Sequence, residues 1–147
     1  MTGVALAAAW ATAAVALAAA ILGAVSWWRV RHSRAFWVVV RAAQAVAIGQ
    51  AVAAGVLFAL SFDPEDGLYW LYAVLPVAVG FFAEQLRLVS TEQVLERLGM
   101  EGAEDVRRLP EDRQRSVVVS ILRREMGVMT LAAIVVCFLA VRAVETL

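Results

Sequence analysis

Four long apolar stretches restrict what this chain can fold into more than any other feature of its sequence. Each has about the 20 residues that a helix needs to cross the hydrocarbon core of a bilayer. They cover residues 4–28, 36–62, 69–88 and 126–144. The pattern therefore predicts an all-α polytopic membrane protein, with an antiparallel bundle of four transmembrane helices and a cytoplasmic helical loop between helices 3 and 4.

Composition supports a membrane location. Of the 147 residues, 63% are hydrophobic, whereas soluble domains have roughly 45–50% apolar residues. The length suits one membrane domain over residues 1–147. All thirteen basic residues are arginines, and thirteen acidic residues balance them. Because no net charge is left to attract a polyanion, we expect no nucleic-acid partner.

Arginines gather in two of the connecting segments, 29–34 and 89–125, whereas the acidic turn at 63–67 has none. Cytoplasmic loops of membrane proteins carry an excess of basic residues. We therefore expect a multi-pass protein of the cell membrane. Residues 29–34 and 89–125 are then cytoplasmic, and both termini lie outside.

The segment 89–125 contains several helix signals. Ser90 and Gln93 have the spacing of a capping box, which predicts a short helix that begins there and stops near Gly99. A second short helix is expected over residues 103–109. Pro110 is followed by two acidic residues, a pattern typical of a first helical turn. We expect this third helix to run without a break into the fourth apolar stretch.

The first apolar stretch is rich in alanine, and small side chains let helices approach closely in lipid. Gly49 and Gly55 are expected to do the same in the second stretch. A cleaved signal peptide usually has basic residues before its apolar run, and residues 1–3 have none. We therefore expect the first stretch to remain as a transmembrane helix.

Two ionisable residues fall inside the predicted spans. Arg41 lies about 10 Å along its helix from Arg34, and Glu84 lies about 4–5 Å from Arg87. Both are therefore close to the cytoplasmic side, at a similar depth. An unpaired charge in lipid is costly, so pairing is favoured. With two neighbouring amides as hydrogen-bond partners, the candidate polar cluster consists of Arg41, Gln44, Glu84 and Gln85.

Three interpretations of this cluster remain open. The two charges can form an ion pair that fixes the register of two helices. Glu84 can instead reach interfacial water. In the functional interpretation, Arg41 holds an anionic group while Glu84 gates or accepts a proton. Pro76 and Gly80 lie on the helix face of Glu84, and a kink at Pro76 would open space beside the carboxylate.

Other polar residues give weaker signals. His32 and Cys137 are the sole histidine and cysteine, so we expect no metal site and no intrachain disulfide. The acidic turn at 63–67 is expected to be solvated. Arginines at the predicted membrane ends are candidates for contacts with lipid headgroups, or form a solvated face balanced by acids. They are Arg29, Arg31, Arg34, Arg123 and Arg124.

The sequence contains no set of residues typical of a catalytic site, so a non-enzymatic protein is favoured over a membrane enzyme that acts on lipids and holds their headgroups with its Arg-rich loop, and no cofactor is expected. The favoured hypothesis is a small bacterial integral membrane protein that acts as a structural, accessory or self-associating subunit. Its partners would be the lipid bilayer, copies of itself or a larger membrane complex. The alternative is a small oligomeric transporter or channel built around Arg41 and Glu84.

Overall fold

The computed structural model describes all 147 residues and consists of helices joined by short connections. Four helices are long and apolar enough to cross a membrane, which confirms the expectation of an all-helical chain with four such segments. The fifth, α4, has five residues. In chain order the helices are α1 (Thr2–Arg29), α2 (Arg34–Ala59), α3 (Leu68–Arg97), α4 (Ala103–Arg107) and α5 (Glu111–Glu145).

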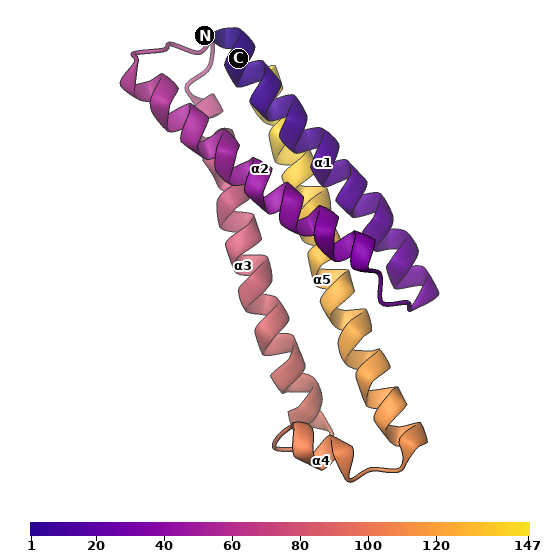
Figure 1. Ribbon diagram of the computed structural model, residues 1–147. Coiled ribbons are helices and arrows are strands. Elements are labelled where there is room, and N and C mark those ends of the chain that lie inside the picture. Colours follow the sequence, from indigo (N-terminus) through magenta and orange to yellow (C-terminus); the bar gives the residue numbers. More distant parts are fainter.

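The long helices form a ring of neighbours rather than a layer (Figure 1). α1 packs along α2 and α5, α3 packs along the same two helices, and α2 scarcely touches α5. Both chain termini lie at one end, while α3 and α5 extend far beyond the α1–α2 turn at the other (Figure 1). We call residues 88–125 the stalk and the remaining residues the body.

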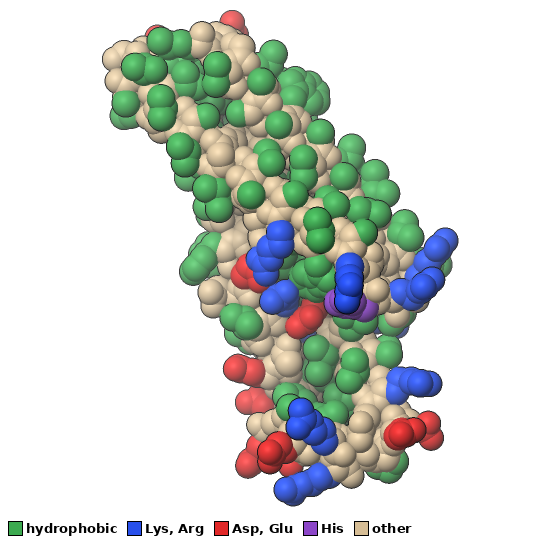
Figure 2. Space-filling model, in the orientation of Figure 1, with side chains coloured by type: hydrophobic (Ala, Val, Ile, Leu, Met, Phe, Trp, Pro, Cys, Tyr) green, Lys and Arg blue, Asp and Glu red, His purple; other side chains and the backbone are tan.

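The body and the stalk differ in surface chemistry. Figure 2 shows hydrophobic side chains over the half of the molecule that holds the termini. Apart from a few acidic side chains at the terminal end, charged side chains begin about halfway along the long axis and continue to the tip of the stalk. Such a boundary is typical of a protein whose apolar half lies in lipid and whose charged half lies in water.

Short, well-capped connections set the order of the helices. Val30 ends α1 in the left-handed conformation (φ 48°), and the Ser33 hydroxyl accepts a hydrogen bond from the Phe36 amide to begin α2. At the other end, an Asp66 carboxylate oxygen accepts from the Leu68 amide at 2.9 Å. The Asp66 amide donates to the Thr146 carbonyl at 3.3 Å, which ties this acidic turn to the end of α5.

The prediction that Ser90 and Gln93 form a capping box in the stalk is wrong. Ser90 lies inside α3, and its hydroxyl donates to the Leu86 carbonyl at 2.6 Å. The Gln93 side chain instead accepts a hydrogen bond from Arg124 of α5 at 2.7 Å. No Gly or Pro interrupts residues 81–97, so the apolar helix continues and the amide of Ser90 needs no cap.

The other helix expectations for the stalk are confirmed. α3 ends at Arg97, and Gly99 follows with a φ of +67°. The short helix expected after it is α4. Pro110 precedes α5 by one residue, and α5 runs unbroken from the stalk into the body. The Gln114 amide donates to the carbonyls of Arg107 and Leu109, which fastens the tip of the stalk.

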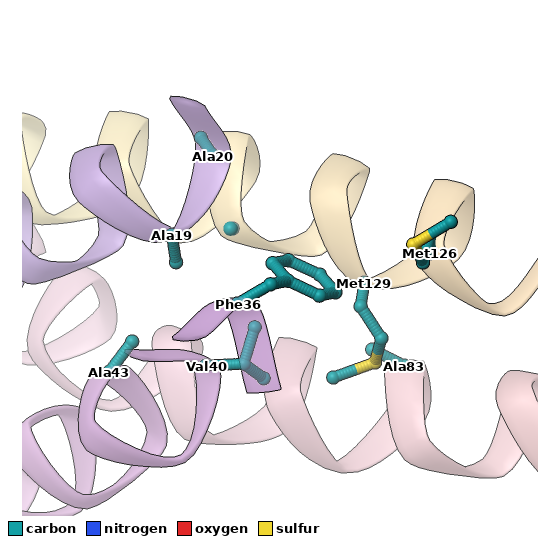
Figure 3. Packing of buried hydrophobic residues seen from close by; sticks show 9 residues of the cluster. Ala19, Ala20, Phe36, Val40, Ala43, Ala83, Met126 and Met129 are labelled. Carbon is teal, nitrogen blue, oxygen red and sulfur yellow. The ribbon is translucent and has the colours of Figure 1, made fainter. Parts of the chain in front are cut away.

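The core consists mainly of small side chains around a few large ones. In the half of the body nearest the stalk, Phe36 is fully buried and lies between the small residues of α1 and the methionines of α5 (Figure 3). Near the termini, Tyr69 is 1% exposed and packs among alanines. The buried alanines allow the helix backbones to approach closely, as expected for helices that pack in lipid.

Gly23 marks a close approach between helices. A Cβ atom added there would lie 2.3 Å from the Thr130 hydroxyl oxygen of α5 and 2.7 Å from a ring carbon of Phe36. Gly49 and Gly55 have no atom within 4 Å of such a Cβ. The expectation that they bring helices together is therefore wrong, because both lie on the outward face of α2.

Candidate functional site

The structure brings Arg41, Gln44 and Glu84 together where α2 meets α3. Arg41 Nη1 donates to Glu84 Oε1 at 2.8 Å and to Gln44 Oε1 at 2.7 Å. Gln44 Nε2 donates to the same Glu84 oxygen at 2.9 Å. The three side chains thus form a closed network, which is possible because Arg41 and Gln44 lie one turn apart on the same face of α2.

Arg87 extends this network on its second side. Its Nε lies 3.4 Å from Glu84 Oε2, and its guanidinium carbon lies 4.9 Å from the ring centre of Trp37. The Glu84 carboxylate therefore lies between two arginines. Two positive charges against one negative charge leave the group with a net charge of +1. In the sequence, Arg87 marks only the end of a span, although its spacing of three residues from Glu84 favours this contact.

The network lies at the edge of the body rather than at its centre. The Glu84 side chain is 22% exposed and the Arg41 side chain 56% exposed. Arg41 therefore reaches outward, while Glu84 lies within the contact between the helices. A long arginine side chain in this position can extend its charged end towards water.

An open groove of about 270 Å³ continues from the network along α2 and α3. Gln44 and Glu84 lie at its polar end, and Ile48 and Phe81 contribute apolar walls. Gly80 leaves room in it, since the nearest atom to an added Cβ is Gln44 Cγ at 3.9 Å. The space lies beside Glu84, as the sequence pattern indicates, yet α3 remains helical through Pro76.

Gln85 does not join the cluster. It is exposed and takes part in no hydrogen bond. Successive residues of a helix point about 100° apart, so a side chain next to Glu84 points away from α2. Its expected role as a hydrogen-bond partner is therefore wrong.

The five arginines at the predicted membrane ends do not form one patch. Arg29 and Arg31 line a surface pocket of about 240 Å³ next to the α1–α2 turn. Arg34 lines a different pocket. The guanidinium carbon of Arg123 lies 5.8 Å from the ring centre of Trp27, and Arg124 donates a hydrogen bond to Gln93 of α3.

The remaining polar candidates have separate surroundings. His32 lies at the α1–α2 turn, in the wall of two surface pockets. Cys137 is partly buried with a free thiol. No group of three or more His, Cys, Asp or Glu side chains lies close enough to hold a metal ion.

This geometry restricts what the network can do chemically. Glu84 Oε1 already accepts two hydrogen bonds, and both of its carboxylate oxygens face an arginine. Such contacts hold α2 and α3 in register. The outward arginines, in turn, present positive charge to any anion at this level of the molecule.

The fold defines a class: an α-helical protein with four segments able to span a membrane. No protein-family model, curated protein or solved structure matches the chain.

Proposed function

We propose that this chain is a non-enzymatic integral membrane protein that acts as a structural or accessory subunit of a larger complex. In this proposal the four long helices cross the cell membrane as an antiparallel bundle. Both termini lie outside, and residues 29–34 and the stalk lie in the cytoplasm. The concentration of arginines in these two segments supports this orientation.

The stalk is the observation that carries the proposal. α5 has fifteen residues before Met126, so it rises about 22 Å beyond the body at 1.5 Å per residue. Both helices of the stalk continue into the body without a break. A partner bound to the stalk is therefore rigidly attached to the membrane-spanning part.

The stalk also offers an apolar surface where one is not expected. Val118 and Val119 are exposed, with the charged residues Glu111, Asp112 and Arg115 around them. They lie about 10 Å from the start of the fourth apolar stretch, beyond the hydrocarbon in the proposed orientation. Apolar residues rimmed by charged ones are typical of protein contact sites.

One set of small residues of α1 packs within the chain, and a second set is exposed, namely Ala7, Ala11, Ala14 and Ala18. Ala9, Ala16 and Gly23 are buried against neighbouring helices, so this face does not serve a second copy. The outward face of α1 carries large side chains such as Trp10 and Leu17. The exposed side of α1 therefore combines small and large residues, and self-association through it is the competing mode of assembly.

The test is the size of the assembly in gently solubilised membranes, measured by native electrophoresis at natural abundance. We expect the chain to run in a complex larger than its own oligomers. The double substitution Val118→Asp and Val119→Asp should release it, while Ser120→Asp, which adds charge on another side of the same turn, should not. If the wild-type chain runs alone or only with its own copies, the proposal fails.

A small oligomeric transporter or channel is the second candidate. The groove beside Gln44 and Glu84 favours it, because it places polar groups next to a path along the helices. The pocket among the helices of one chain has only about 30 Å³, room for about one water molecule. A pathway would therefore need several copies. Proteoliposome flux should fall with Glu84→Gln and Arg41→Ala but not with Gln85→Ala, and flux indifferent to all three excludes this site.

A further inference from the structure

A second polar feature lies next to the network, on the side of the stalk. It is an open pocket of about 480 Å³ between the α1–α2 turn, the first turns of α2, and the neighbouring parts of α3 and α5. Its lining residues are His32, Arg34, Trp37, Val38, Arg87 and Glu125. Of the five arginines expected to contact lipid headgroups, Arg34 lines this pocket, and the proposed role of the stalk does not account for it.

The pocket has more positive than negative groups available. Arg34 and His32 form no ion pair, and Arg87 forms one only with Glu84. Glu125, the acidic residue in the wall, accepts a hydrogen bond from Thr91 at 3.3 Å. The pocket also adjoins the first turn of α2, where backbone amides and the helix dipole attract negative charge.

One buried hydrogen-bond donor on a lining residue has no acceptor. It is the indole Nε1 of Trp37, whereas the Nε of Arg87 already lies 3.4 Å from Glu84 Oε2. Buried donors in proteins are nearly always paired, so an unpaired one requires an explanation. An anionic oxygen ligand in the pocket would supply an acceptor for a donor of this kind and would also match the positive charge of the wall.

The pocket and the groove lie end to end along α2. Trp37, Arg41, Gln44 and Ile48 follow one another at spacings of three or four residues and so share one face of the helix. Trp37 belongs to the pocket, and Ile48 belongs to the groove, with the Arg41–Glu84 network between them. A ligand that covers both features therefore needs an anionic head and an apolar tail.

We infer that the contact between α2 and α3 is a binding site for one anionic phospholipid. The phosphate lies in the pocket at Arg34, Trp37 and Arg87, and an acyl chain lies in the groove past Gly80. Charge complementarity supports the anionic headgroup, and the apolar walls of the groove support the chain. The site does not depend on whether the stalk binds a partner.

Native mass spectrometry in detergent tests this inference directly. The protein is titrated with phosphatidylglycerol or with phosphatidylcholine of the same acyl chains, and the retained lipid is counted. We expect one phosphatidylglycerol per chain, with an affinity about tenfold above that of phosphatidylcholine. Arg34→Gln and Arg87→Gln should each weaken binding about fivefold. Arg113→Gln, which removes an exposed charge on the stalk, should leave it unchanged.

Further variants separate binding from folding and separate lipid from free anion. Arg87→Lys keeps the charge, so it should retain most of the affinity, and the unfolding temperature of every variant is measured alongside. Gly80→Phe fills the groove and should weaken lipid binding. Excess inorganic phosphate should not displace the lipid. Equal affinity for the two lipids, indifference to both arginine variants, or displacement by inorganic phosphate would each overturn the inference.

Discussion

Two helix contacts in the body hold their helices together in different ways. Where α1 meets α5, the side chains are small, and Gly23 lies directly against Thr130. Where α2 meets α3, Glu84 joins the helices through hydrogen bonds from Arg41 and Gln44, and a groove remains open beside them. The first contact is closed and apolar, and the second is polar and incompletely filled.

The difference shows what each contact is suited to do. Lipid tails are as apolar as the helix surfaces, so helices in a bilayer gain little from hydrophobic burial and associate through close packing or hydrogen bonds. Close packing leaves no room for a ligand. Hydrogen bonds at one level can hold two helices together and leave space at the next level. The α2–α3 contact is therefore where a ligand fits, and the α1–α5 contact is where stability is concentrated.

Gly23→Ala should produce the largest loss of stability. The added Cβ would overlap the Thr130 hydroxyl and the Phe36 ring, so α1 must move away from both neighbours. Overpacking of this kind costs about 1–3 kcal/mol. Thermal unfolding in detergent, followed by tryptophan fluorescence, measures the loss. Gly49→Ala is the matched control, because its Cβ meets nothing within 4 Å. Equal unfolding temperatures for the two variants would show that α1 and α5 are not in close contact.

Glu84→Ala should have the next largest effect. It leaves Arg41 and Gln44 without their shared acceptor and leaves two arginine charges without a counter-charge. Hydrogen bonds between membrane helices are worth about 1–2 kcal/mol at most, which sets the expected loss. Arg41→Ala should cost less, because Arg41 is the more exposed partner. The same unfolding assay applies, with Gln85→Ala as control. A loss with Gln85→Ala as large as that with Glu84→Ala would contradict the network.

Gln50→Leu should have the opposite sign. Gln50 is 2% exposed, and neither its amide oxygen nor its amide nitrogen has a hydrogen-bond partner. Burial of an unpaired amide is unfavourable, so an apolar side chain of similar size should stabilise the body by about 1 kcal/mol. The variants Gln50→Asn and Gln50→Leu can be compared in the same unfolding assay. A lower unfolding temperature for Gln50→Leu would mean that the amide has a partner, such as an ordered water.

The helices were predictable because their signals are local. Apolar length predicts four membrane-length helices, Gly99 predicts the end of α3, and Pro110 predicts the start of α5. The capping box failed for a physical reason: Ser90 has the right neighbours for a cap, but no residue before it ends the helix. A cap pattern therefore predicts a helix start only where the preceding segment also stops.

The candidate site was predictable in part. Depth along the helix brings Arg41 and Glu84 to the same level, and the turn between α2 and α3 makes these helices neighbours. The sequence did not determine the rotation of each helix about its own axis, which decides which side chains face a neighbouring helix. Gln85 points away from α2, and Gly49 and Gly55 face outward. Small residues run through all of α1, so nothing in its sequence alone distinguishes Gly23 as the residue that the fold requires.

Gly80→Ala should have the smallest effect and gives the sharpest comparison between the two contacts. It is the same substitution as Gly23→Ala, at a buried face of a helix in the same body. Here, however, the nearest atom to the added Cβ is Gln44 Cγ at 3.9 Å, an ordinary contact distance. Alanine also favours the helix over glycine, so we expect a gain of about 0.5 kcal/mol rather than a loss. If Gly80→Ala destabilised the protein as strongly as Gly23→Ala, the groove between α2 and α3 would be closed in solution. The contrast between a closed and an open contact would then fail together with the space for a lipid chain.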